Sequence, residues 1–300
     1  MSYIITTSNL SKGYPNTTAV DSVDLHVEEG AVYGLIGRNG AGKTTLLRML
    51  SGLSRPSAGE IEFGRRTDGK KPRIGVLIED PGIYNSLSAV KNLEIKRIAL
   101  HAPGGEERSR ELLRFVGLEN WADVRTGSFS PGMRQRLAIA LALTGDPDIV
   151  ILDEPLNGLD PQGLRDIRLI LQRLHEERKT IIISSHQLSE LSKFATVYGI
   201  MEQGRLVKEA SEEEILETMP GYVRLIVDDT AAAKKVLEEM NIFSYQTKSS
   251  HMIHVLEQLG RQDEMLDRME QAGIHVHECR VIRDSLEDYF IGITRGGSGR

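Results

Sequence analysis

Short apolar runs alternate with helical patterns between residue 3 and about residue 208. The runs Ile74–Leu77, Ile149–Leu152 and Thr180–Ser184 are apolar at almost every position, which is typical of parallel strands buried on both faces. The alternation predicts an α/β domain with a mostly parallel sheet wrapped by helices. The other elements expected there are strands at Ile4–Thr7 and Val32–Ile36, and helices after Gly42, after Pro131, after Pro161 and over Gln187–Phe194.

The pattern changes after the acidic stretch SEEEILETMPG, which indicates a domain boundary near residue 220. The later elements have the order of a small α+β domain with the split βαβ arrangement of ferredoxin-like folds. They are strand Tyr222–Val227, helix Thr230–Met240, strands Ser244–Lys248 and Met252–Leu256, helix Arg261–Ala272 and strand His275–Val281. The sequence therefore predicts domains at residues 1–220 and 221–294, and a disordered tail at residues 295–300.

Each of the two C-terminal helices carries an apolar stripe that we interpret as core. The stripes consist of Ala233, Val236, Leu237 and Met240 in the first helix and Met265, Leu266, Met269 and Ala272 in the second. A final helix, SLEDYFIGI, has Leu286, Phe290 and Ile293 on one face. We interpret it as a packing element, and docking to a partner is the alternative.

Composition excludes several classes of protein. The longest apolar run, Leu137–Leu143, is far shorter than the roughly 18 residues that predict a membrane span, and the start lacks the pattern of a secretory signal. A single cysteine, Cys279, excludes an internal disulfide framework. The formal charge of −6 is opposite to the basic balance of nucleic-acid binders. We expect a cytosolic protein that binds no nucleic acid.

A glycine-rich segment, GRNGAGKTT, follows one expected strand and opens one expected helix. It satisfies the pattern G-x-x-x-x-G-K-[ST], in which glycines let successive N–H groups surround phosphate oxygens at a helix N-terminus. Lys43 supplies a positive charge, and Thr44 supplies an oxygen for Mg²⁺. The predicted phosphate-binding residues are Gly37, Asn39, Gly40, Ala41, Gly42, Lys43, Thr44 and Thr45.

Two acidic residues, Asp153 and Glu154, follow the strand Ile149–Leu152, at the strand end where open α/β sheets place their chemistry. Alone, such a pair is better explained as a surface turn, but the phosphate loop favours a functional interpretation. We expect Asp153 to hold Mg²⁺ directly or through water, and Glu154 to orient or deprotonate the attacking water. His186 follows the strand TIIISS and is a candidate for substrate contact, although a lone histidine is usually structural.

The order of GRNGAGKTT, FSPGMRQRL, ILDEPLNGLD and SSH resembles the nucleotide-binding domains of ATP-binding cassette (ABC) transporters over about residues 3–208. Other phosphate-loop ATPases share the first and third motifs but lack the second. The resemblance implies a phosphate-loop NTPase cassette with a helical signature subdomain. It also implies that Ser130 and Gly132 bind the γ-phosphate held by the opposite subunit, so the protein dimerises around ATP.

The same resemblance implies roles for residues that carry little signal alone. Tyr14 would stack on adenine, Asp160 would lie in the loop that crosses the dimer seam, and His186 would sense the γ-phosphate. Without the resemblance, Tyr14 would be interpreted as a turn or core residue. The implied cofactors are ATP and Mg²⁺, and the implied catalytic residues are Lys43, Glu154 and His186.

Two positions depart from the usual family pattern. Glu79 stands where the family has glutamine, and a carboxylate can coordinate Mg²⁺ but cannot donate as an amide does. Glu79 is therefore a candidate metal ligand with Thr44 and Asp153. The signature reads SPGM in place of SGGQ, so Pro131 removes one backbone donor and Met133 one side-chain amide. We expect activity to be retained.

The segment LIEDPGIY and the C-terminal domain ending in SLEDYF resemble ATP-binding subunits of the bacitracin and lantibiotic exporter group. This implies an ATPase, as a homodimer or heterodimer, that powers a separate membrane permease from the inner face of the membrane and exports a peptide antibiotic or similar compound. One alternative is a soluble ABC ATPase acting in translation or DNA maintenance, which the single cassette and acidic balance disfavour. The other is a low-turnover ATP-binding regulator, which the intact acidic pair and His186 disfavour.

Overall fold

The computed structural model describes residues 2–66, 68–218 and 221–283. The chain divides into two compact units, residues 1–214 and 215–300. The division falls within α7 (Glu212–Thr218), a few residues before the boundary expected near residue 220. Among the residues described, no helix combines the length and the apolar character needed to cross a membrane.

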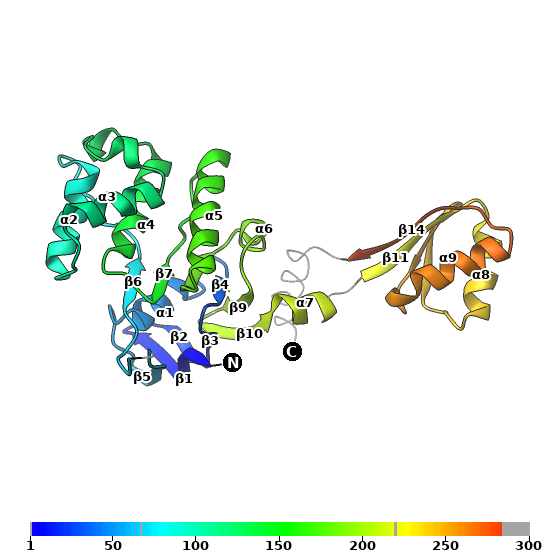
Figure 1. Ribbon diagram of the computed structural model, residues 1–300. Coiled ribbons are helices and arrows are strands. Elements are labelled where there is room, and N and C mark those ends of the chain that lie inside the picture. The colour runs from blue at the N-terminus through cyan, green and yellow to red at the C-terminus, as the bar shows by residue number, and fades with distance from the viewer. Residues whose placement is uncertain (1, 67, 219–220, 284–300) are drawn as a thin grey trace. The chain divides into compact units, whose positions relative to one another are not determined.

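The first unit is built on a six-stranded sheet with the order β10-β9-β4-β8-β7-β6 (Figure 1). All neighbouring strands are parallel except β10 and β9, which form an antiparallel pair. Every residue of β4, β7 and β8 is buried, and for β7 and β8 the continuous apolar runs predicted this burial. The same prediction for β6 was wrong, because β6 is the edge strand of the sheet and only its residues Gly75 and Leu77 are buried. The strands are β4 (Val32–Ile36), β6 (Ile74–Leu77), β7 (Ile149–Leu152), β8 (Thr180–Ser185), β9 (Val197–Glu202) and β10 (Arg205–Ser211).

Helices α1 (Lys43–Leu50), α5 (Pro161–Glu176) and α6 (Leu188–Leu191) follow β4, β7 and β8 respectively. Helix α6 is much shorter than the predicted Gln187–Phe194. The Ser192 hydroxyl donates to the Ser189 carbonyl oxygen at 3.2 Å, and this local bond competes with continuation of the helix.

A second, antiparallel sheet packs beside the first. It contains β1 (Tyr3–Tyr14), β2 (Thr17–Val23), β3 (His26–Glu28) and β5 (Ala58–Phe63). The strand expected at Ile4–Thr7 is present as part of β1, but it lies in this sheet. A shared core joins the two sheets and α1, and it includes Leu10, Val20, Leu35, Leu46, Leu47, Ile151 and Ile182.

A helical insertion, residues 88–143, separates the neighbouring strands β6 and β7 (Figure 1). It contains α2 (Ala89–Ala99), α3 (Gly105–Phe115), short 3₁₀ turns at Glu119–Trp121 and Thr126–Ser128, and α4 (Pro131–Leu143). Residues 137–143 of α4 are all buried, so this apolar run is the core of the insertion. We call residues 78–87 the outgoing linker and residues 144–148 the return linker.

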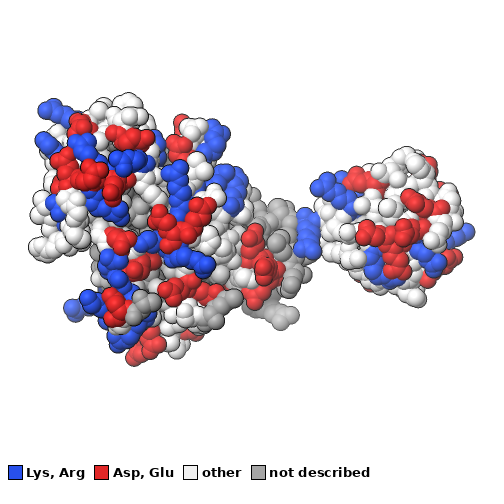
Figure 2. All heavy atoms as spheres, viewed as in Figure 1, with Lys and Arg blue, Asp and Glu red and all other residues white. Residues whose placement is uncertain are grey.

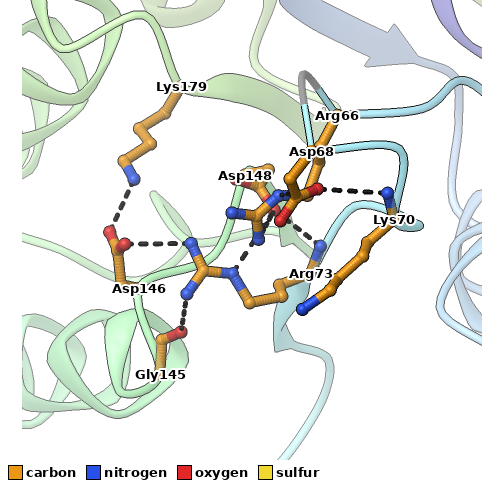
Figure 3. Close-up of polar contacts among 8 residues, drawn as sticks. All are labelled: Arg66, Asp68, Lys70, Arg73, Gly145, Asp146, Asp148 and Lys179. Carbon is orange, nitrogen blue, oxygen red and sulfur yellow. Dashed lines mark hydrogen bonds and ion pairs between the residues drawn. The ribbon is translucent and has the colours of Figure 1, made fainter. Parts of the chain in front are cut away.

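Arg73 holds the return linker through several hydrogen bonds (Figure 3). Its guanidinium donates to the Gly145 carbonyl oxygen at 3.2 Å and to Asp146 at 2.9 Å, and its backbone N–H donates to Asp148 at 2.7 Å. Lys179 donates to the other oxygen of Asp146 at 2.8 Å. Asp146 has a left-handed φ of 50°, which is unfavourable for a residue with a side chain, so its bonds to Arg73 and Lys179 stabilise this backbone conformation.

The second unit is a four-stranded antiparallel sheet with the order β12-β13-β11-β14. Its elements are β11 (Gly221–Val227), α8 (Thr230–Glu239), β12 (Tyr245–Ser249), β13 (Met252–Val255), a 3₁₀ turn at Leu259–Arg261, α9 (Gln262–Gln271) and β14 (Val276–Arg283). This is the element order that the sequence predicts.

The core of the second unit lies between its sheet and its two helices. It contains the whole predicted stripe of α8 and, from α9, Met265 and Met269. Leu266 is only partly buried and Ala272 is exposed, so the predicted stripe of the second helix was too wide. Ile242 and Ile274, in the connections after each helix, complete the core. The helix expected at residues 285–293 and the tail at 295–300 lie outside the described residues.

Arg73→Ala should lower the free energy of unfolding of the first unit by about 1–3 kcal/mol, because it removes charge-assisted hydrogen bonds to the return linker. The only tryptophan, Trp121, lies in the first unit, so its fluorescence during urea unfolding measures the change. Arg65→Ala is the matched control, because exposed Arg65 bonds only the nearby Gly69 carbonyl oxygen within the described residues.

The effect of Arg73→Ala should also depend on pH. Hydrogen bonds from Lys179, and then from Arg73, hold the pKa of Asp146 below its usual value. A lowered carboxyl pKa contributes stability that is fully present above the unfolded pKa of about 3.9 and is lost as pH falls through the folded pKa. The difference in free energy of unfolding between the wild type and Arg73→Ala should therefore become smaller below about pH 4. An increase of this difference at acidic pH would contradict the role given to Asp146.

Candidate nucleotide-binding site

The phosphate loop, residues 37–45, connects β4 to α1 and requires glycine for steric reasons. A Cβ atom on Gly37 would lie 2.5 Å from the Met201 carbonyl oxygen, and one on Gly42 would lie 2.3 Å from the Ala19 carbonyl oxygen. Gly42 also caps α1 with a φ of 101°. The loop is thus pressed against β2 and β9, and its exposed tip is formed by Arg38, Asn39 and Gly40.

Lys43 is 5% exposed, and its ammonium group is surrounded by acceptors. It donates to the Gly37 carbonyl oxygen at 2.6 Å and to the Arg38 carbonyl oxygen at 3.4 Å, and it lies 3.2 Å from an oxygen of Glu154. A buried charge must be paired and hydrogen-bonded, so these contacts fix the ammonium group inside the loop.

Asp153 and Glu154 stand at the carboxyl end of β7 and face different partners. Asp153 accepts from the Thr44 hydroxyl at 2.7 Å and from the Ser184 hydroxyl at 2.5 Å. Glu154 lies beside Lys43, and its other carboxylate oxygen is 2.9 Å from His186 Nδ1. The structure thus brings Lys43, Thr44 and His186 to the acidic pair, as expected for the ends of neighbouring parallel strands.

Ser184 belongs to this cluster, although the sequence did not single it out. Its hydroxyl donates to Asp153 and accepts from the Glu154 backbone N–H at 2.8 Å. Glu154 has a left-handed φ of 48°, so this bond supports a backbone that most residues avoid. The available signal was a pair of serines ending a buried apolar strand, because a fully buried hydroxyl needs a hydrogen-bond partner.

Ser130, Gly132 and Asp160 form a separate group at two helix starts. The Ser130 hydroxyl caps α4 by accepting from the Met133 N–H at 3.3 Å, and Pro131 takes the first helical position. Asp160 caps α5 by accepting from the Gly163 N–H at 2.7 Å. A Cβ on Gly132 would lie 3.7 Å from Gly163 Cα, so the two helix starts adjoin. Within the described chain, no hydrogen bond joins this group to the phosphate loop.

Tyr14 and Glu79 lie at the edges of the site. Tyr14 is 44% exposed at the end of β1, and the Lys12 ammonium group lies 5.6 Å from its ring centroid. Glu79 has a φ of 59° and forms an ion pair with Arg48 of α1. Among the described residues, Glu79 has no hydrogen bond to Thr44 or Asp153.

The donor set suits a divalent cation that is bound jointly with phosphates. Mg²⁺ is typically held by one or two protein oxygens, substrate phosphates and water. The adjacent Thr44 hydroxyl and Asp153 carboxylate fit that pattern, and the described residues hold no cluster of three or more histidine, cysteine or acidic side chains suited to a metal alone. On the face of each unit in Figure 2, basic and acidic side chains are interspersed, so that face lacks the continuous basic surface used to bind nucleic acid.

Comparison with known proteins identifies the family. A family model described as ABC transporter matches residues 20–157. The bacitracin transport ATP-binding protein BcrA of Bacillus licheniformis is 39% identical over 99% of this chain and 99% of its own length. The chain belongs to the ABC transporter ATP-binding proteins. A second relative of this cassette, the lantibiotic transport ATP-binding protein SrtF of Streptococcus pyogenes, is 40% identical over 70% of this chain and 93% of its own length.

Solved structures confirm the predicted cassette fold. A dimeric ATP-binding cassette in a post-hydrolysis state, bound to ADP and phosphate, matches with a TM-score of 0.61 and 26% identity. The match covers 69% of this chain and 98% of that one. A structure described as the ATP-binding subunit of an ABC transporter matches 71% of this cassette protein, with a TM-score of 0.61 and 29% identity.

Ser184→Ala should reduce ATP hydrolysis by about 10- to 100-fold, because it removes the hydroxyl that orients Asp153 and supports the Glu154 backbone. Steady-state phosphate release at saturating ATP measures the effect. Ser192→Ala is the matched control, because Ser192 is half-buried and, within the described residues, its hydroxyl bonds only the Ser189 carbonyl oxygen. Equal activities of the two variants would show that Ser184 has no positioning role.

Proposed function

We propose that this protein is the ATP-hydrolysing subunit of an exporter, and that two subunits enclose ATP and drive a separate membrane permease. The observation that carries the proposal is the joint placement of Lys43, Thr44, Asp153, Glu154 and His186 at one edge of the parallel sheet. The side chains needed to hold phosphates, a divalent cation and an attacking water are thereby gathered in one place.

The proposed chemistry is in-line displacement at the γ-phosphorus. Water attacks, the bond to the oxygen bridging the β- and γ-phosphorus atoms breaks, and ADP and phosphate are released. Glu154 accepts a proton from the attacking water. His186 Nδ1, 2.9 Å from the Glu154 carboxylate, fixes the orientation of that carboxylate. Lys43 exchanges its contact with Glu154 for a γ-phosphate oxygen, which frees Glu154 to face the water.

The Thr44 hydroxyl and Asp153 carboxylate would hold Mg²⁺, which supplies charge neutralisation on the phosphate oxygens when bound. The phosphate-loop glycines, Asn39, Ala41 and Thr45 would surround the phosphates, and Tyr14 would stack on the base. Glu79 contributes to this metal site only if its ion pair with Arg48 opens. Its direct effect on metal binding is therefore smaller than that of Asp153.

The SPGM segment that contains Ser130 and Gly132, called the signature loop below, completes the nucleotide site of a second subunit. Ser130 and Gly132 lie at the N-terminus of α4, where helix N–H groups and the helix dipole favour a phosphate. Asp160 starts the adjacent helix α5 and would lie at the same seam. The proposal therefore requires a dimer, formed by two copies of this chain or by this chain and a similar one.

The permease would dock on the face formed by α2 and the end of α1. Leu53 and Leu100 are more than half exposed there, at 66% and 51%. Leu53 and Leu100 line a cavity of about 360 Å³ together with Lys96 and Arg73. Apolar side chains rimmed by basic ones are typical of a protein interface, and this docking would place the protein at the inner face of the membrane.

The proposed cargo is a peptide antibiotic or a similar compound. Its support comes from the names of the relatives, of which the bacitracin protein matches both units of this chain over nearly their whole length. In the host, deletion of the gene should raise sensitivity to bacitracin or a lantibiotic about tenfold or more, measured as the minimum inhibitory concentration. Re-expression of the wild type should restore resistance, and Glu154→Gln should not. Unchanged sensitivity to both classes would contradict this cargo while leaving the ATPase assignment intact.

Glu154→Gln should bind ATP with unchanged affinity, hydrolyse it at least about 100-fold more slowly and accumulate a dimer. The amide keeps the size of the carboxylate but cannot accept the proton. Size-exclusion chromatography with ATP measures the dimer, and phosphate release measures turnover. A monomer with normal hydrolysis would overturn the role given to Glu154.

Ser130→Arg in the Glu154→Gln background tests whether the signature loop of one subunit completes the nucleotide site of the other. The added side chain obstructs the phosphate-facing helix start, so the ATP-bound dimer should be lost while each monomer still binds ATP. Ser128→Arg is the matched control, because the hydroxyl of this exposed serine bonds only the Arg125 carbonyl oxygen within the described chain. A persistent Ser130→Arg dimer would show that the signature loop does not face the partner's nucleotide.

A further inference from the structure

A second cavity lies in the first unit, between the helical insertion and the main sheet's helices. It has a volume of about 400 Å³, within the roughly 300–1,000 Å³ of small-molecule sites. Helix α3 and the end of α4 form one wall, the C-terminal half of α5 forms the other, and the return linker residues Asp146 and Pro147 form part of the lining. It shares no lining residue with the candidate nucleotide site.

The cavity combines an apolar interior with unpaired guanidinium groups. Leu112, Leu143 and Leu174 are at most 7% exposed and supply the apolar surface. Arg114 and Arg173 also line it, and neither has a carboxylate partner among the described residues. Arg173 donates one N–H to the Phe115 carbonyl oxygen at 3.2 Å, which orients its guanidinium group without neutralising the charge.

The remaining charges on the lining favour an anion. Arg108 is paired with Glu111 at 2.8 Å, and Lys179 is paired with Asp146 at 2.8 Å. Glu177 is the lining carboxylate without a basic partner in the described part of the chain. Two unpaired guanidinium groups thus oppose one unpaired carboxylate, and a guanidinium group can bind a carboxylate through two parallel hydrogen bonds.

We propose that this cavity is a regulatory site for a small amphipathic carboxylate, with its acid group on Arg114 and Arg173 and its apolar part on the three leucines. Such a ligand contacts the insertion, the return linker and α5 at once. It therefore favours one orientation of the insertion relative to the sheet. Because the insertion carries Ser130 and Gly132, the ligand changes the rate of ATP hydrolysis.

The probe for the test is 2-naphthoate, and its neutral isostere 2-naphthamide is the control compound. Isothermal titration calorimetry on the full chain, with saturating Mg²⁺ and ADP to occupy the phosphate loop, should show 2-naphthoate binding with a Kd of about 1 mM or tighter. The amide should bind at least about tenfold more weakly. Equal binding of the two compounds would overturn the assignment of the guanidinium groups.

Arg114→Gln and Arg173→Gln should each weaken 2-naphthoate binding by about tenfold or more. Arg165→Gln is the matched control on α5, because exposed Arg165 bonds Gln162 and lies outside the cavity lining. Trp121 fluorescence in urea checks that all three variants remain folded. Unchanged binding in both cavity variants, or an equal loss in Arg165→Gln, would contradict the site.

The regulatory role is tested separately, by measuring the rate of ATP hydrolysis with and without 2-naphthoate. ATP hydrolysis by the wild type should change at least about twofold on saturation with 2-naphthoate, and Arg173→Gln should abolish this response at the same probe concentration. If the probe binds through Arg114 and Arg173 but hydrolysis does not change, the regulatory role is wrong and the cavity is only a binding site. A wild type that hydrolyses no ATP at all would instead contradict the proposed function.

Discussion

A lysine ammonium group that is almost excluded from water must find its acceptors inside the protein, and the nucleotide site is organised around that requirement. Lys43 meets it with two loop carbonyl oxygens and the Glu154 carboxylate. The loop can present those carbonyls only because glycine fits against neighbouring backbone at Gly37 and Gly42. The charge on Lys43 thus connects the packing of the phosphate loop to the position of Glu154 after β7. Both the loop and Glu154 are placed by the order of the parallel strands.

Much of the architecture and of this site could be predicted from the sequence. Continuous apolar runs made β7 and β8 recognisable as strands buried on both faces, and β4 was also expected as a strand. The similar run of β6 predicted a strand correctly, but β6 lies at the sheet edge and is only half buried. Because the carboxyl ends of these strands share one edge, the motifs on them were expected to meet, and Thr44, Asp153, Glu154 and His186 do meet. Local motifs, together with the rule that the carboxyl ends of parallel strands share one sheet edge, were sufficient to predict these contacts.

Other features depend on contacts that no local pattern contains. Strand β5 is largely exposed and polar, and its role becomes clear only when it pairs with β1, about fifty residues away. Helix α3 is so rich in charged residues that its apolar stripe is only two leucines wide. Ser184 resembled an ordinary strand residue, because its importance comes from two partners, Asp153 and Glu154, that directly follow β7. The pairing of Glu79 with Arg48 likewise depends on how β6 lies beside α1.

The helical insertion leaves the sheet at its edge strand β6 and returns at the adjacent strand β7. Among the described residues, no strand-pairing hydrogen bond connects the sheet to the insertion, apart from the main-chain contacts of its two linkers. A rotation of the insertion therefore requires torsion-angle changes in the linkers while the sheet ladder stays intact. Motions of this type occur in microseconds to milliseconds, whereas breaking a buried ladder is a far slower local unfolding. The sheet can thus serve as a fixed reference frame for a rotation of the insertion, which carries Ser130 and Gly132.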